Sequence, residues 1–186
     1  MLAAGEGRRL GRPKAVVELD GERLVDRAVR MLREGGCRSV TVVAGAVPLE
    51  VAGATVVTND QWRTGMASSL RAGLSAQPDE VDAVVVSLVD QPGIGGVAVG
   101  RVVAAVRSGA EVAAASYGGL LRNPVGLHRR HWPAVLEAAT GDRGARAFLA
   151  ARPELVSPVE VGDVADPADI DTAADLERLG RGRAGR

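Results

Sequence analysis

The chain has 186 residues, of which 46% are hydrophobic and 25% charged, and its formal net charge is zero. This length suits one well-buried domain better than two. A zero net charge provides no overall field that would recruit nucleic acid or an anionic membrane. Aromatic residues make up only 2% of the chain, which leaves few rings for stacking on single strands. We therefore expect neither a nucleic-acid partner nor a membrane partner.

Cys37 is the only cysteine, which excludes an intramolecular disulfide and a thiolate metal cluster. No apolar run approaches the roughly 20 residues that span a bilayer. The N-terminus lacks the basic lead and apolar region of a secretory signal. The expected location is the cytoplasm.

Lys14 is the single lysine of the chain, beside 22 arginines. Where arginine is used so freely, a retained lysine indicates a site that needs a compact ammonium group rather than a planar guanidinium. Survival by chance is the alternative explanation. We therefore treat Lys14 as a candidate functional residue.

Short runs rich in Val and Ala alternate with amphipathic segments, which predicts parallel βα units. In chain order, the expected strands are 2–4, 39–44, 54–57, 82–89, 111–116, 120–127 and 155–161. The expected helices are 24–32, a short one capped by Ser68 or Ser69 and ending at 74, 97–106, 132–138, 144–151, and one capped by Asp171 or Thr172 and ending at 179. This order predicts one three-layer α/β domain over residues 1–179.

Glycines and polar residues mark several boundaries of these elements. Gly35-Gly36 should end the first helix, and Gly118-Gly119 should turn the chain from 111–116 into 120–127 as a hairpin. Residues 180–186 are too polar and too rich in glycine to pack, which predicts a frayed tail. Met1 stands only two residues before Ala3, so the first strand is short, and we expect the natural protein to begin upstream of Met1.

A glycine-rich loop follows the first strand. Gly5, Gly7 and Gly11 should leave backbone N–H groups free to hold phosphate oxygens, and Arg9 and Lys14 would add positive charge. The dinucleotide motif G-x-G-x-x-G is excluded because Gly11 falls one residue late. A Walker A motif is excluded because Lys14 neither follows glycine nor precedes serine or threonine. A glycine-rich turn with surface arginines is the alternative.

Asp90 follows directly after the apolar strand 82–89, at the end where parallel sheets gather their ligands. A carboxylate there needs a cation, and Mg²⁺ held by one or two carboxylates and by substrate phosphates would supply one. Asp169 and Asp171 flank an apolar residue, so they should point to one side of an extended chain, and one of them could reach the same metal. Helix capping is the alternative for all three aspartates.

Ser68 and Ser69 lie at an expected helix start, where an anion or a base edge could bind, although a simple cap is the alternative. His128 and His131 flank two arginines, which would repel a metal ion. We therefore assign these histidines no metal site.

Together these motifs resemble the molybdenum cofactor cytidylyltransferase branch of the nucleotidyltransferase superfamily, over essentially residues 2–179. The segments that carry the resemblance are L-A-A-G-E-G-R-R-L-G-R-P-K (2–14), N-D-Q-W-R-T-G-M-A-S-S-L (59–70), D-Q-P (90–92), N-P-V (123–125), G-D-R-G-A-R (141–146) and D-I-D-T-A-A-D-L (169–176). The resemblance implies a Rossmann-like nucleotidyltransferase fold with a mostly parallel central sheet.

The resemblance also implies roles for individual residues. The catalytic residues would be Lys14, Arg9 and Asp90, and the ligands of Mg²⁺ would be Asp90 and Asp171. The nucleotide would be bound by Leu2, Ala3, Ala4, Gly5, Gly7, Gly11, Lys14, Ser68 and Ser69. The acceptor side would be formed by Asn123, Asp142 and Arg146. The implied reaction is in-line attack by an acceptor phosphate on the α-phosphorus of a nucleoside triphosphate, with release of pyrophosphate.

The implied substrates follow from the branch. Alanine at the position of Ala4 goes with cytidine or uridine users, which favours CTP, and molybdopterin is the leading acceptor. A molybdoenzyme or its chaperone would then be a partner. Asn123 stands where histidine is common, which leaves other acceptors open, namely a sugar phosphate, a polyol phosphate or phospholactate. A nicotinamide-dependent oxidoreductase adapted from the same fold and a regulatory nucleotide-binding protein are the further alternatives.

Overall fold

The computed structural model describes residues 1–181. The strands are β1 (Glu18–Leu19), β2 (Glu22–Arg23), β3 (Thr41–Ala44), β4 (Thr55–Thr58), β5 (Ala83–Val86), β6 (Val112–Tyr117), β7 (Leu120–His128) and β8 (Val156–Glu160). The α-helices are α1 (Leu24–Glu34), α2 (Met66–Ser75), α3 (Gly96–Arg107), α4 (Trp132–Ala138), α5 (Arg146–Ala151) and α6 (Ala173–Arg181). The 3-10 helices are η1 (Lys14–Val16), η2 (Trp62–Thr64), η3 (Arg129–His131), η4 (Gly141–Arg143) and η5 (Pro153–Leu155).

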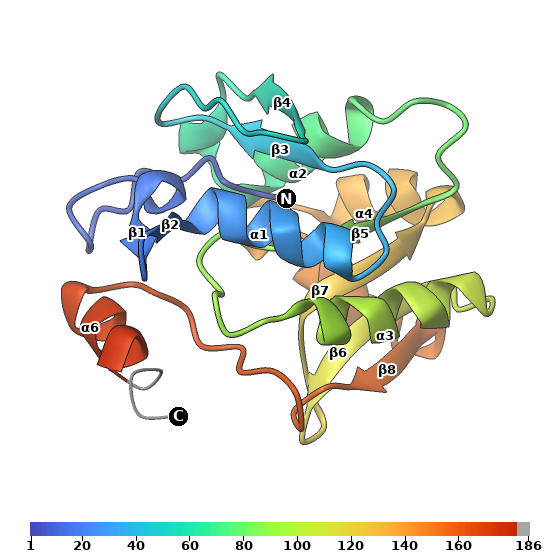
Figure 1. Cartoon of the computed structure of the whole chain (residues 1–186). Helices are drawn as coiled ribbons and strands as arrows, with labels where there is room; N and C mark the ends of the chain where they lie inside the picture. The colour runs from blue at the N-terminus through green and yellow to red at the C-terminus, as the bar shows by residue number, and fades with distance from the viewer. Residues whose placement is uncertain (182–186) are drawn as a thin grey trace.

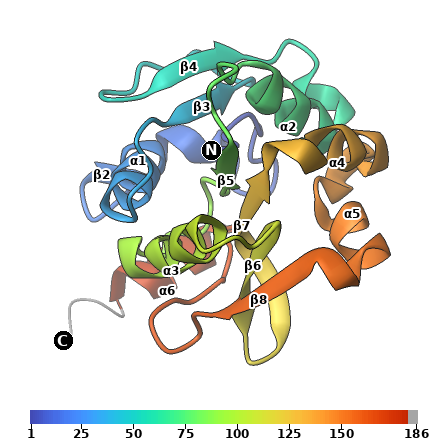
Figure 2. The same ribbon diagram turned by 90° about the vertical axis from the view of Figure 1, so that its right-hand side faces the viewer.

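The central sheet is mostly parallel, as expected. β3 pairs with β4 and β6 pairs with β8 in parallel, whereas β7 runs antiparallel to both β5 and β6. Leu2 forms parallel bridges to Val43 of β3 and to Leu88 just after β5, so the N-terminal segment joins the two halves of the sheet. The order across the sheet is therefore β4, β3, the N-terminal segment, β5, β7, β6 and β8 (Figure 2).

Helices cover both faces of this sheet, which confirms the three-layer architecture. Helices α1 and α3 lie on one face, and α2, α4 and α5 lie on the other (Figures 1 and 2). Alternate residues of β6 serve the two faces: Ala113 and Ala115 pack with α1 and α3, whereas Val112 and Ala114 pack with the opposite helices. This period of two is the pattern of a strand that is buried on both sides.

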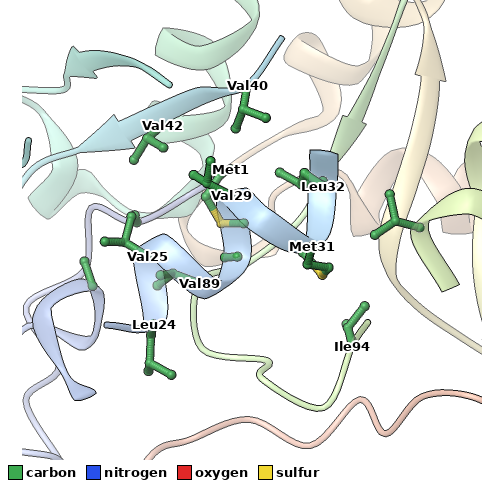
Figure 3. Close-up of a cluster of buried hydrophobic side chains, with 14 of the residues drawn as sticks. Met1, Leu24, Val25, Val29, Met31, Leu32, Val40, Val42, Val89 and Ile94 are labelled. Carbon is green, nitrogen blue, oxygen red and sulfur yellow. The ribbon is translucent and has the colours of Figure 1, made fainter. Parts of the chain in front are cut away.

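The N-terminal segment is held as an inner strand. Leu2 N–H donates to the carbonyl of Ser87 (2.9 Å) and Ala3 N–H donates to the carbonyl of Val43 (3.0 Å). In return, the N–H groups of Val43 and Val89 donate to the carbonyls of Met1 (2.9 Å) and Leu2 (3.1 Å). The Met1 side chain is 8% exposed and packs among α1, β3 and Val89 (Figure 3). The following loop therefore leaves the middle of the sheet.

Most expected elements are present within a few residues of their predicted ends, including the β6–β7 hairpin and the end of α1 before Gly35. The expected start of α2 was wrong, because the helix begins at Met66 with Gly65 as its N-cap, which places Ser68 and Ser69 inside it. The β1–β2 hairpin was missed, although Asp20 and Gly21 (φ 56° and 79°) form a recognisable turn.

At the C-terminal end, α6 continues to Arg181 rather than ending at 179, while 182–186, the remainder of the predicted tail, lie outside the described residues. Within residues 1–181, no helix combines the length and the apolar character needed to cross a membrane.

The contact between α1 and α3 provides a test of the packing. A Cβ added at Gly35 would lie 2.3 Å from Cγ1 of Val99, whereas one added at Gly100 would meet its nearest neighbour, the Gly35 carbonyl oxygen, at 3.8 Å. We expect Gly35→Ala to lower the free energy of unfolding by about 1–3 kcal/mol, because one helix must move. Gly100→Ala should raise it by up to about 1 kcal/mol, because alanine favours the helix. Urea denaturation measures both variants, and equal effects would contradict this packing.

Candidate active site

A cleft of about 290 Å³ lies at the carboxyl end of the central strands. Three segments that follow neighbouring strand ends form most of its wall: the loop after Ala3, the segment after β4 that contains Trp62 and Met66, and residues Leu88 to Asp90 after β5. Parallel strands bring their carboxyl ends to one edge of a sheet, which explains why these distant segments meet. The cleft is therefore the candidate active site.

Lys14 lies at the centre of the charged part of the cleft. Its Nζ atom donates to Oδ2 of Asp90 and to Oδ1 of Asp171, both at 2.7 Å. The three side chains are only 17%, 19% and 29% exposed, so water screens these ion pairs less than it would at the open surface. A guanidinium nitrogen of Arg9 lies 2.9 Å from the second oxygen of Asp171. One ammonium group thus joins η1, the end of β5 and the segment before α6.

The surroundings of Lys14 stabilise the protonated form of its side chain. Burial works against the ammonium form, but the carboxylates of Asp90 and Asp171 outweigh it and raise the pKa of Lys14 above its ordinary value. The side chain is consequently a fixed cation at neutral pH. A fixed cation beside a glycine-rich loop favours a ligand with several negative charges.

Asp90 and Asp171 suit a divalent cation that a ligand helps to hold. Their carboxylates converge on one point, the ammonium nitrogen of Lys14, and Oδ1 of Asp90 is buried without a hydrogen-bond partner. Within residues 1–181, no cluster of three or more His, Cys, Asp or Glu side chains could hold a metal ion. Two carboxylates with substrate phosphates as further ligands is a usual mode of Mg²⁺ binding. Asp90 and Asp171 fit that mode, in which the substrate supplies the remaining ligands of the metal ion.

The other two acidic side chains of the last motif have different partners. Asp169 accepts a hydrogen bond from Nε2 of Gln91 at 2.9 Å. Asp175 accepts from the N–H of Thr172 (2.9 Å), and its own N–H donates to the Thr172 hydroxyl (3.3 Å), which is a capping box for α6. Since Thr172 provides the cap, the carboxylate of Asp171 is free to bind Lys14.

The structure brings most of the predicted nucleotide-binding residues together. The predicted residues that line the cleft are Leu2, Ala3, Ala4, Gly5, Gly7, Lys14 and Ser69. Gly11 and Ser68 do not line it. Gly11 has φ 77° and closes the turn of the loop, while the Ser68 hydroxyl donates to the carbonyls of Gln61 (3.0 Å) and Gly65 (2.9 Å).

The acceptor-side residues are more scattered. Asp142 lines the cleft, and its Oδ1 accepts from the N–H of Met66 at 3.2 Å. Asn123 lies in β7, two residues before the pairing of Val125 with Val86, and is not part of the cleft wall. Arg146 is exposed at the start of α5 and is not part of the wall either. Of the three predicted acceptor-side residues, only Asp142 lines the cleft.

Asn59 begins the segment 59–70 that carries the resemblance, but it was not predicted as a site residue. It is 6% exposed, and its Nδ2 donates to the hydroxyl oxygens of Ser68 (2.8 Å) and Ser69 (3.0 Å). Its Oδ1 accepts from the N–H of Gln61 at 3.0 Å. Asn59 therefore ties the chain after β4 to helix α2. The sequence signal for this link was the presence of Asn59, Ser68 and Ser69 in the single segment 59–70, because an amide can donate to both hydroxyls.

Replacement of Asn59 tests this link. Asn59→Ala should lower the free energy of unfolding by about 1–3 kcal/mol, because the N–H of Gln61 and the two serine hydroxyls lose a buried partner. Thermal denaturation followed by circular dichroism measures the effect. Gln61→Ala is the matched control, since its side chain is exposed and only its backbone takes part. Equal stability of the Asn59 variant and the control would contradict the link.

Two comparisons place the chain among known proteins. The model of the MobA-like NTP transferase domain matches residues 1–156. The chain is 37% identical over 194 residues to a protein named nicotine blue oxidoreductase from Paenarthrobacter nicotinovorans, and the match covers 96% of this chain and 94% of that protein.

Solved structures have the same fold. A mycobacterial homologue of Rv0371c, from Mycobacterium sp. strain JC1, superposes with a TM-score of 0.85 at 29% identity over 98% of this chain and 93% of that one. Rv0371c of Mycobacterium tuberculosis H37Rv in complex with manganese superposes with a TM-score of 0.79 at 22% identity, over 97% of this chain and 95% of that one. With the family match, these superpositions confirm the expected nucleotidyltransferase fold. The chain belongs to the family of MobA-like NTP transferase domains.

Proposed function

We propose that this chain transfers a nucleoside monophosphate from a nucleoside triphosphate to a phosphorylated acceptor, with CTP as the donor and molybdopterin as the acceptor. The observation that carries the proposal is the position of Lys14, between Asp90 and Asp171 in a cleft that begins with a glycine-rich loop. This arrangement supplies cations and N–H groups for a triphosphate, and two carboxylates for its metal ion. Alanine at position 4 is the basis for choosing CTP.

The proposed mechanism needs no protein nucleophile. Backbone N–H groups of the loop 4–7 hold the triphosphate, while Lys14 and Arg9 neutralise its charge as it develops towards pyrophosphate. Asp90 and Asp171 would hold a divalent cation, which when bound neutralises phosphate charge. The acceptor phosphate attacks the α-phosphorus in line, and the protein contributes chiefly by positioning the two substrates.

The acceptor would approach from the side of Asp142. Asp142 joins the cleft to η4, and Asn123 and Arg146 lie on elements around this end of the sheet. The manganese complex of Rv0371c supports the use of a divalent cation, with Mg²⁺ as the proposed ion here. A molybdoenzyme or its chaperone would receive the product.

A reductase is the second candidate, because the relative with 37% identity is named nicotine blue oxidoreductase. In that case the same cleft would bind a nicotinamide nucleotide and a substrate such as the nicotine blue of that protein's name. The loop 5–11 lacks the dinucleotide motif, and the Lys14 cluster has no evident use in hydride transfer. These two features favour the transferase.

One experiment separates the two candidates. The protein is incubated with Mg²⁺, each of the four triphosphates in turn and reduced molybdopterin, and the release of pyrophosphate is measured. Sugar phosphate, polyol phosphate and phospholactate replace molybdopterin in parallel reactions. A parallel assay follows oxidation of NADH and NADPH in the presence of nicotine blue, the dye in the relative's name. We expect pyrophosphate with CTP and molybdopterin. Nucleotide-dependent dye reduction without pyrophosphate release from any pair would overturn the proposal.

We expect activity to depend on the shape of the Lys14 side chain as well as on its positive charge. We expect Lys14→Ala to reduce kcat/KM by about 30- to 1000-fold, since a lost oxyanion donor costs about 2–4 kcal/mol. Lys14→Arg should restore only part of the activity, because a planar guanidinium does not place one nitrogen between two carboxylates. Arg152→Ala is the control, since Arg152 is an exposed cation paired with Glu154. Activity of Lys14→Ala within threefold of the parent would refute the assignment.

The two carboxylates should act as a unit. Asp90→Asn and Asp171→Asn should each abolish most of the Mg²⁺-dependent activity, and the double variant should be scarcely worse than either one. Each variant should also lose Mn²⁺ binding in the presence of a non-hydrolysable CTP analogue, measured by electron paramagnetic resonance. Asp169→Asn is the control, because its partner is Gln91. Additive losses would show separate roles for Asp90 and Asp171, and an equal loss at Asp169 would reassign the second ligand.

A further inference from the structure

Trp62 is a half-buried indole in the wall of the cleft that holds Lys14. The chain contains two tryptophans, one tyrosine and one phenylalanine. Trp132 and Phe148 are buried beneath α4 and α5, and the hydroxyl of Tyr117 donates to the carbonyl of Asn123 at 3.0 Å. Of these four aromatic residues, all within the described part of the chain, only Trp62 lines the cleft.

The backbone holds Trp62 against the base of the glycine-rich loop. The N–H of Trp62 donates to the carbonyl of Asn59 (3.2 Å), and the N–H of Asn59 donates to the carbonyl of Ala44 at the end of β3 (2.9 Å). A Cβ added at Gly45 would lie 2.7 Å from the Cβ atoms of both Trp62 and Ala4. Glycine at 45 therefore permits Trp62 and Ala4 to approach each other closely.

The cleft has two chemically different kinds of wall. Lys14, Arg9, Asp90 and Asp171 provide the charged part, which suits phosphates and a metal ion. Trp62 and Met66 line the same cleft and are its large uncharged side chains on the segment after β4. A nucleoside triphosphate has the same two parts, a polyanionic chain and a flat ring with apolar faces.

The indole is also oriented by a cation. The guanidinium carbon of Arg63 lies 4.3 Å from the centre of the Trp62 ring, a cation–π distance. Arg63 thereby covers one face of the ring of Trp62, a residue that lines the cleft. A held ring loses little conformational freedom on binding a flat ligand, which favours stacking.

We propose that Trp62 stacks against the nucleobase of the donor nucleotide, an inference that rests on the proposed transferase function. Stacking tolerates every base because each has a π face. Trp62 would accordingly supply affinity for nucleotides in general, while its neighbour Ala4 would supply the choice of base. The cleft would hold the donor by its two ends, with the phosphates at Lys14 and the base at Trp62.

Isothermal titration with two ligands tests this role. CTP contains the base, and tripolyphosphate is the same polyanion without it. We expect Trp62→Leu to weaken CTP binding by about 5- to 150-fold, the range of base–aromatic stacking. Trp62→Phe, which keeps a ring, should lose no more than about threefold. Tripolyphosphate should bind equally to the parent and to both variants, and GTP should lose about as much affinity as CTP.

Fluorescence gives a second readout of the same contact. Binding of CTP should quench the tryptophan emission of the parent protein, and Trp62→Phe should abolish the quenching. Trp132 should not respond, because it is 6% exposed and its Nε1 donates to the carbonyl of Leu127 (3.2 Å). Tripolyphosphate should leave the emission unchanged in both proteins.

Four results would overturn the inference. Unchanged CTP affinity in Trp62→Leu would show that no stacking occurs. An equal loss for CTP and tripolyphosphate would show that Trp62 only supports the loop. A loss confined to molybdopterin would place the ring on the acceptor side. A parent protein that binds neither CTP nor tripolyphosphate would overturn the proposed function as well, whereas the first three results leave it intact.

Discussion

The geometry of the site depends on the two ion pairs that the ammonium group of Lys14 forms with Asp90 and Asp171. Each carboxylate lies on a different segment, and each pairs with the same nitrogen at 2.7 Å. Without a cation between them, the two negative charges would repel each other in a partly buried cleft. The end of β5, the segment before α6 and the end of the glycine-rich loop are therefore fixed relative to one another by charge.

The acidic residues of the last motif, Asp169, Asp171 and Asp175, have different structural partners. A capping box of Thr172 and Asp175 holds the start of α6, and Gln91 holds Asp169. The carboxylate of Asp171 pairs instead with Lys14 and Arg9. Asp90 and Asp171 face the cleft, where their carboxylates could bind a metal ion that also binds phosphates. Lys14, their cationic partner, is the group that phosphates would attract.

The comparisons and the site point to the same scaffold but not to one substrate. The family model describes an NTP transferase domain, whereas the full-length relative at 37% identity is named an oxidoreductase. What distinguishes the proposed transferase is the charged end of the cleft: that reaction must neutralise a triphosphate and a leaving pyrophosphate, and Lys14 beside Asp90 and Asp171 is the group that we propose for this role.

The sequence by itself determined the elements and the residue types of the site. Helical periodicity located α1, a continuous apolar run located β5, and the Gly118-Gly119 turn located the β6–β7 hairpin, because each of these signals lies within one short stretch of chain. Local patterns did not reveal that Asn59 ties two segments together, that Gly45 lets Trp62 approach Ala4, or that Asn123 and Arg146 lie outside the cleft wall. Residues distant in sequence decide these features, because a hydrogen bond or a close approach exists only once the sheet has brought both partners to one edge.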